Sequence, residues 1–146
     1  MTDEGKNIKV IGCFDGQLIT DVTIAKPMVE NGNLVSDVER DILKMVVVNR
    51  YAKAKPAVAF IRNFGLKQGA IASSVAHDSH NIVAVGTSDE EIVAAVNKLI
   101  ENKGGVVAYS REESVVLPLP VAGLMSADEG EKVAENYEKA DALVHR

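Results

Sequence analysis

The segment GAIASSVAHDSHNIVAVG, from Gly69 to Gly86, most constrains the fold, because two apolar runs enclose a polar stretch. Each run has the length and composition of a buried strand. Side chains that stay polar so close to a buried sheet need hydrogen-bond partners, a metal or a substrate. We therefore expect two neighbouring strands joined by a turn, and that turn is the first candidate for a functional site. Its polar residues are His77, Asp78, Ser79, His80 and Asn81, which include two of the chain's three histidines.

Other apolar runs predict a sheet of several strands. Some of them, Ala57–Ile61 and Ile82–Val85 among them, are apolar on both alternating faces, which favours strands covered on both sides. Asp15-Gly16 is typical of a tight hairpin between the first two runs, and Arg111–Glu113 predicts a short connection between the last two. The predicted strands are Ile8–Phe14, Leu18–Ala25, Ala57–Phe64, Ala70–Ala76, Ile82–Gly86, Val106–Ser110 and Ser114–Leu119.

Three Ser-x-x-Glu patterns, each followed by apolar residues at helical spacing, predict three helices, because the serine and glutamate side chains satisfy N–H groups of the first turn. The first helix would carry its apolar stripe from Val38 to Asn49. Together these elements predict a single domain over residues 1–146, of the α/β or α+β class, with a mixed β-sheet and about three helices packed on it. The pairs are Ser36 with Glu39, Ser88 with Glu91, and Ser126 with Glu129.

Charge patterning limits the kinds of partner. The formal net charge of −5 and the pI near 5.2 argue against a general nucleic-acid binder, which needs clustered positive charge. No acidic residue occurs between Ile42 and His77, however, while six basic residues do. That stretch fits either an ordinary solvated surface or a surface that docks on another domain or an anionic ligand. The six are Lys44, Arg50, Lys53, Lys55, Arg62 and Lys67.

Compartment signals indicate the cytoplasm. Cys13 is the only cysteine, so no disulfide forms within the chain, and we expect it to be a small buried strand residue. The N-terminal residues lack the apolar core of a signal peptide, and no apolar run approaches the ~20 residues of a membrane helix. A second apolar stretch, Leu117–Met125, holds two prolines, which predicts an edge or crossover covered by the domain's own helix or by another domain.

Two geometries would bring His77 and His80 together: a tight hairpin turn with Cβ atoms ~5 Å apart, or a short helix with both on one face. Three interpretations stay open, namely a turn whose side chains bind backbone, an active-site contribution as general base, and a metal site. Two histidines are only half a zinc site, so Asp78 or a distant ligand would have to complete it. Ser73 and Ser74 lack the Gly-x-Ser-x-Gly pattern of a nucleophile, which disfavours a Ser-His-Asp triad.

Two long segments carry a resemblance to a known family. They are GAIASSVAHDSHN and LPLPVAGLMS, and the first lies in a run from NRYAKAKPAVAFIRNFG to TSDEEIVAAVNKLIENKGG. The sequence resembles the C-terminal domain of bacterial and archaeal adenine deaminases, which belong to the amidohydrolase superfamily. The likeness covers most of the chain.

The resemblance implies a metal-dependent hydrolase of purine salvage that converts adenine to hypoxanthine and ammonia, in which a TIM-type barrel precedes this domain. It implies a divalent metal, manganese, iron or zinc, held by barrel motifs that include His-x-His. This chain contains no His-x-His, so the barrel and its metal are expected outside it, and the chain alone is expected to be inactive. The partners implied are adenine, the barrel domain and further copies of the chain in a homo-oligomer, with no nucleic acid and no membrane.

On this interpretation the polar turn supports the active site of the barrel. His77, Asp78 and His80 are the candidate catalytic residues, in supporting roles. Two other functions stay open: a structural or oligomerisation module with no part in chemistry, and an independent metallohydrolase that uses the two histidines. The candidate substrate-binding residues are Ser73, Ser74, Ser79 and Asn81.

Overall fold

A computed structural model describes residues 7–146, and its main element is an eight-stranded mixed sheet. The strands are β1 (Ile8–Gly12), β2 (Asp21–Ala25), β5 (Ile42–Val48), β6 (Ala57–Arg62), β7 (Ala70–Ser73), β8 (Ile82–Gly86), β9 (Gly105–Tyr109) and β10 (Ser114–Pro118). Across the sheet they follow the order β10-β9-β7-β8-β5-β6-β1-β2, in which β1 and β6 are parallel and the other neighbours are antiparallel. The predicted mixed sheet is confirmed.

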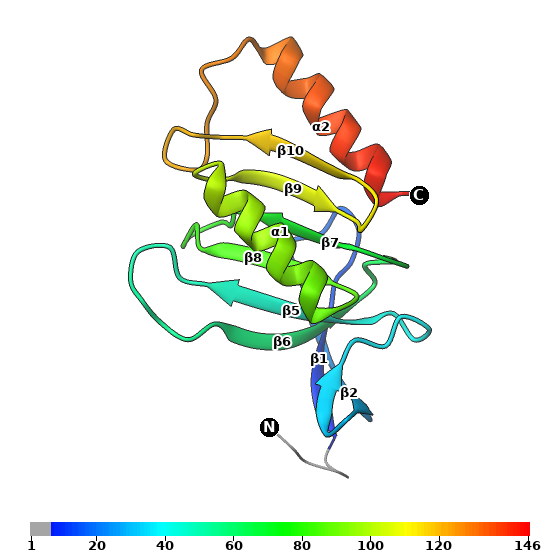
Figure 1. Ribbon diagram of the computed structural model, residues 1–146. Helices are drawn as coiled ribbons and strands as arrows, with labels where there is room; N and C mark the ends of the chain where they lie inside the picture. Colours follow the sequence, from blue (N-terminus) through cyan, green and yellow to red (C-terminus); the bar gives the residue numbers. More distant parts are fainter. Residues whose placement is uncertain (1–6) are drawn as a thin grey trace.

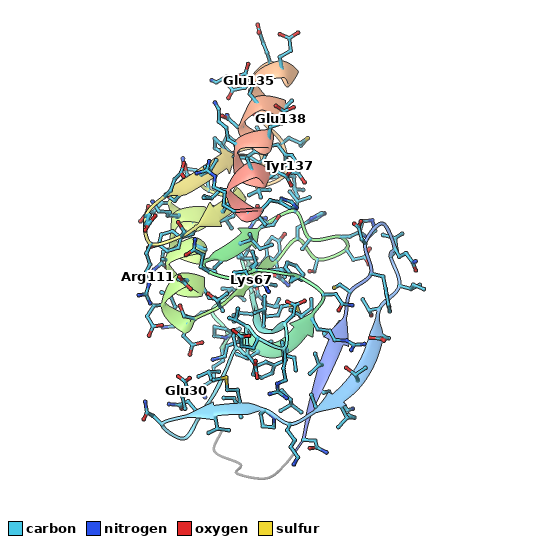
Figure 2. All side chains as sticks on the ribbon, turned by 90° about the vertical axis from the view of Figure 1, so that its right-hand side faces the viewer. Glu30, Lys67, Arg111, Glu135, Tyr137 and Glu138 are labelled. Carbon is cyan, nitrogen blue, oxygen red and sulfur yellow. The ribbon has the colours of Figure 1, made fainter. Side chains whose placement is uncertain are left out.

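Two helices pack on this sheet (Figure 1). Helix α1 (Asp89–Glu101) contacts β7, β8 and β9, and α2 (Gly130–Val144) contacts β10 and β9. Figure 2 views the molecule from the side and shows that α2 rises beyond the other elements, with Glu135, Tyr137 and Glu138 along its exposed part. Within residues 7–146, no helix has both the length and the apolar character needed to span a lipid bilayer.

The predicted helix starts differ in their outcome. At α1 the serine cap is confirmed, because the Ser88 hydroxyl accepts a hydrogen bond from the Glu91 N–H. The Glu91 carboxylate binds the hydroxyls of Thr87 and Ser88 in place of the expected backbone N–H. At α2 the N-cap is Glu129, which makes no side-chain cap bond. The Ser126 hydroxyl instead accepts the N–H of Asp128, two residues along the chain. The third helix is thus present without its predicted cap.

The helix predicted after Ser36 is wrong, and residues 7–146 contain two helices rather than about three. Residues 42–48 form β5, in which three successive valines fit a pleated sheet better than a helix. The Ser36 hydroxyl donates to the Gly86 carbonyl (2.8 Å) and accepts the Lys44 N–H (2.8 Å), so it joins β5 to β8 instead of capping a helix. The apolar spacing did not identify the strand, because a strand that is buried on both faces lacks the alternation of apolar and polar residues.

A two-stranded ribbon, β3 (Met28–Glu30) and β4 (Asn33–Val35), was not predicted. Asn31 (φ 50°) and Gly32 (φ 77°) form its turn. Asn-Gly is the residue pair that favours such turns, so the signal was in the sequence. The strands themselves are only three residues long, too short for an alternating pattern to stand out.

Helix α1 lies on a strip of small side chains. Ala70, Ala72 and Ala84 are buried on the face of the sheet that α1 covers. Gly86 continues this strip, since a Cβ atom there would lie 2.7 Å from atoms of Ala70 and Ile92. The small residues let the helix approach the sheet closely, and Leu99 is almost fully buried there.

The opposite face has its own core. Leu43, Ile61 and Val85 are buried there, and Val144 at the end of α2 packs against them. Because side chains alternate along a strand, β5 and β8 are covered on both faces at their centres. This double cover explains the apolar run Ile82–Val85. For Ala57–Ile61 the expectation is only partly correct, because Phe60 and Ile61 are buried but Val58 is 59% exposed.

Replacing Leu99 with alanine should lower the free energy of unfolding by about 2–5 kcal/mol, because it opens a cavity between α1 and the sheet. Ile100 is the matched control, since it follows on the same helix and is 54% exposed. Ile100→Ala should cost less than about 1 kcal/mol. Urea denaturation followed by circular dichroism measures both, and equal losses would contradict the packing described.

A charged pair fixes the chain just before β5. The Asp37 carboxylate accepts hydrogen bonds from the backbone N–H of Arg40 (3.0 Å) and from its Nε (2.6 Å). Burial raises the pKa of the Asp37 carboxyl, but the hydrogen bonds and charge of Arg40 outweigh burial and hold it below its ordinary value. Residues 37–42 thereby form a tight turn that leads into β5.

Arg40→Gln should raise the pKa of Asp37, as measured by carboxyl carbon NMR titration. Because the folded pKa is lowered, the stability from the pair is complete above the unfolded pKa and is lost as pH falls through the folded value. The difference in unfolding free energy between the native chain and the variant should therefore be largest near neutral pH and shrink in acid. A difference that does not change with pH would show that the pair contributes nothing through charge.

Candidate functional site

Three loops meet at one end of the sheet, on the left in Figure 1. They comprise residues 49–56, 74–81 and 119–125, and we call this region the three-loop end. The strand register brings them together, because Val48 pairs with Ile82 and Ser73 with Val106, while Pro118 pairs with Gly105. The polar stretch is therefore beside the two other loops.

The polar stretch forms the turn between β7 and β8, as predicted. The His80 N–H donates to the Ala76 carbonyl (2.7 Å), and the Ser79 N–H donates to the His77 carbonyl (3.0 Å). Asp78 (φ 70°) and His80 (φ 48°) both have the left-handed backbone conformation that non-glycine residues rarely adopt. Such a turn persists only where its surroundings hold it in place.

The candidate catalytic residues occupy different environments. His77 and Asp78 are fully in solvent, with side chains 96% and 90% exposed, and their Nδ1 and Oδ1 atoms lie 2.9 Å apart. His80 is partly buried, and among the described residues its Nδ1 atom has no hydrogen-bond partner although it is inaccessible to solvent. An exposed imidazole-carboxylate pair and an incompletely bonded imidazole thus lie on the same turn.

The candidate substrate-binding residues mostly bind the protein itself. Ser74 is fully buried, and its hydroxyl donates to the Gly123 carbonyl (2.6 Å) and accepts the Gly105 N–H (2.8 Å). The Ser73 hydroxyl accepts the N–H of Val75, and the Ser79 hydroxyl that of Asn81. Ser74 therefore has a structural role in joining two loops, and substrate contact by the other three stays a prediction.

Arg50 is the residue that sequence reasoning missed. Its Nη1 donates to the His80 carbonyl (3.1 Å) and its Nη2 to the Ala122 carbonyl (3.0 Å), while its backbone N–H donates to Asn81 Oδ1 (3.3 Å). Its guanidinium also lies 5.8 Å from the ring of Tyr51. One side chain therefore connects all three loops. Its place in an acid-free stretch was visible in the sequence, but its backbone acceptors were not.

Exposed apolar side chains lie on all three loops of this end. Tyr51, Val75, Val121 and Met125 are 70%, 50%, 46% and 56% exposed, and each belongs to one of the three loops. The run 117–125 was predicted to be covered. The chain itself buries Leu117 and Leu119 in this run but leaves Val121 and Met125 exposed. A partly apolar surface around charged groups is typical of an interaction or substrate-binding surface.

The described residues do not fit a metal ion. Among residues 7–146, no three His, Cys, Asp or Glu side chains come close enough to hold one. His77 and Asp78 supply at most two ligands, and both are solvent-exposed. Burial also raises the pKa of the Cys13 thiol, which disfavours the thiolate that metals bind.

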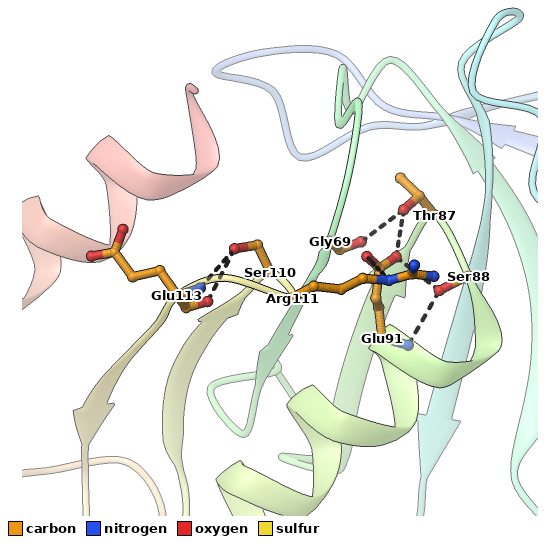
Figure 3. A network of polar contacts seen from close by, with 7 residues as sticks. All are labelled: Gly69, Thr87, Ser88, Glu91, Ser110, Arg111 and Glu113. Carbon is orange, nitrogen blue, oxygen red and sulfur yellow. Dashed lines mark hydrogen bonds and ion pairs between the residues drawn. The ribbon is translucent and has the colours of Figure 1, made fainter.

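A second polar network lies at the other end of the sheet (Figure 3). The buried Glu91 carboxylate accepts hydrogen bonds from the hydroxyls of Thr87 (2.7 Å) and Ser88 (2.8 Å), and Arg111 lies 3.9 Å away. The Thr87 hydroxyl also contacts the Gly69 carbonyl. The bond from the Glu91 N–H to the Ser88 hydroxyl caps α1, and Thr87 joins this turn to the loop before β7, so the network has a structural role.

Comparison with known proteins assigns the family. The family model described as the adenine deaminase C-terminal domain matches residues 17–146. The chain belongs to this family. The resemblance inferred from GAIASSVAHDSHN and LPLPVAGLMS is thereby confirmed.

Relatives named adenine deaminase match nearly the whole chain. The protein of Methanosarcina barkeri is 56% identical over 137 residues, which are 94% of this chain and 25% of the relative. The protein of Parabacteroides distasonis is 47% identical over 143 residues, which are 98% of this chain and 26% of the relative. The chain thus spans about a quarter of the length of the curated relatives that it matches.

Ser74→Ala should lower the free energy of unfolding by about 1–3 kcal/mol, because it leaves the Gly105 N–H and the Gly123 carbonyl without their buried partner. Ser73→Ala is the matched control, since its hydroxyl binds only nearby backbone, and should cost at most about 1 kcal/mol. Chemical denaturation measures the two losses. If both variants unfold alike, the buried serine is not a structural link.

Proposed function

We propose that the chain acts as the C-terminal domain of an adenine deaminase and that its three-loop end closes the active site over adenine. The observation that carries this proposal is the turn at residues 77–81. It presents an exposed histidine and carboxylate, it is hydrogen-bonded to Arg50, and the loops at this end also carry exposed apolar side chains. The relatives are named adenine deaminase, which supports this reaction. Because the chain matches only about a quarter of their length, the complete enzyme is long enough to include a catalytic barrel.

The groups on the turn suit the reaction. Hydrolysis of adenine adds water at C6 and releases ammonia, so protons must leave the water and reach the departing amine. An imidazole next to a carboxylate can take up and transfer a proton, and the His77–Asp78 pair has this arrangement. Closing the loop over the purine would also exclude competing solvent.

The expected divalent metal would be held by residues outside this chain, since the described residues do not fit one. The exposed apolar residues Tyr51, Val121 and Met125 then contact the barrel around the active site and lose their exposure there. Lys53 and Lys55, exposed on the same loop as Tyr51, would lie at the rim of this contact. On this proposal the enzyme works in purine salvage in the cytoplasm, and the isolated chain does not deaminate adenine.

A second candidate function, assembly into a homo-oligomer, is favoured by one observation at the other side of the sheet. Among the described strands β2 is an edge strand, and Val22 and Ile24 on it are 63% and 61% exposed. Leu18 and Ile19 just before it are also exposed. An unpaired apolar edge promotes association with a second copy of the chain. Analytical ultracentrifugation of the chain, before and after Ile24→Lys, tests this second function.

His77→Ala and His80→Ala should each lower the turnover of the complete deaminase by roughly 10²-fold or more, the range for a positioned acid or base, while the thermal unfolding temperature stays unchanged. His145, exposed at the end of α2, is the matched control and should have no effect. Steady-state release of ammonia from adenine measures the rates. Unchanged turnover in both variants would exclude a role of the turn in chemistry.

A further inference from the structure

Building on the proposed function, we infer that Arg50 is a positioning residue that sets the orientation of His80 toward the active site. The guanidinium donates to the backbone carbonyls of His80 and Ala122, which lie 30 and 72 residues away in the chain. It therefore joins the turn at residues 77–81 to the loop at residues 119–125. Arg50 contacts neither substrate nor metal in this account and acts through His80.

The conformation of His80 makes this support necessary. Its φ of 48° is unfavourable for a residue with a side chain, by about 1–3 kcal/mol for such strained positions. The carbonyl that Arg50 binds belongs to the same residue, so the hydrogen bond fixes the peptide plane next to the Cα atom that carries the imidazole. The Arg50 N–H binds the side chain of Asn81, the next residue along the chain. Arg50 thus holds the C-terminal side of His80, while the His80 N–H, which donates to the Ala76 carbonyl (2.7 Å), holds the N-terminal side.

Other hydrogen bonds also join these loops. Ser74 joins the same loops independently, through the Gly123 carbonyl and the Gly105 N–H. The Leu119 N–H also donates to the Gly104 carbonyl. Loss of Arg50 should therefore leave the loops folded and release only the position of His80. This separation allows positioning to be tested apart from stability.

The shape of the guanidinium is as important as its charge. Two carbonyls in different loops are bound by two nitrogen atoms of one planar group, a geometry that the single ammonium group of lysine does not reproduce. Gly123 faces this group, since a Cβ atom there would lie 2.3 Å from Arg50 Nη2. A side chain at position 123 would displace the guanidinium, and it would also strain the backbone, because Gly123 has a φ of 75°.

The test uses the complete deaminase that carries this domain, with Arg50→Ala and Arg50→Lys, each made alone and in a His80→Ala background. In the single variants kcat should fall roughly 10-fold to 100-fold, as for small misplacements of reacting groups, with KM changed less than about threefold. In the His80→Ala background the arginine substitutions should have little further effect, because the imidazole that Arg50 positions is gone. The control is Arg111→Ala, an exposed arginine at the other end of the sheet.

The outcomes separate this inference from the proposed function. If His80→Ala itself leaves turnover unchanged, the role of His80 in the proposed function fails, and the positioning role fails with it. If His80→Ala lowers turnover but the Arg50 variants do not, or if Arg50→Lys retains full activity, the positioning role is overturned while the proposed function stands. An equal loss from Arg50→Ala with and without His80 would also overturn it, since Arg50 would then act independently. Should Arg50→Ala not fold, Arg50→Lys decides the question.

Discussion

The close approach of α1 to the sheet is the constraint on which the rest of the structure depends. Ala70, Ala72 and Ala84, continued by Gly86, leave space for the buried side of the helix. These small residues belong to β7 and β8, so seating the helix also fixes the two strands that carry the polar turn. The helix ends beside Gly104 and Gly105, and the Gly105 N–H then binds the buried Ser74 hydroxyl. The position of the three-loop end therefore depends on how α1 packs at the centre of the domain.

The three-loop end combines hydrogen-bonded loops with exposed polar groups. Ser74 and Arg50 hold the loops through hydrogen bonds to backbone carbonyls, whereas His77 and Asp78 stand in solvent. A site that completes its surroundings in another domain is expected to have this form, because its own bonds can fix the loop while the tips stay free for a substrate. The exposed apolar residues on the three loops add the surface through which such a domain would be contacted.

The parts of this structure that the sequence predicts are those set by local pattern. The turn between β7 and β8 and the capped start of α1 follow from residues that are neighbours in the chain. Strand β5 could not be separated from a helix, because burial on both faces removes the strand period and the partners of Ser36 lie in other elements. Arg50 could not be recognised either, since its acceptors are distant backbone carbonyls that no side-chain pattern reveals. The family was nevertheless recognisable from two idiosyncratic segments.

The most direct test of the central claim is a crystal structure of the complete deaminase with hypoxanthine bound. The account predicts that the turn at residues 77–81 lines the purine pocket, with His80 held by Arg50 as in the free domain. Tyr51, Val121 and Met125 should be buried against the barrel around that pocket, having lost the exposure they show here. A purine pocket closed entirely by other parts of the enzyme, with the turn on its outer surface, would contradict the account.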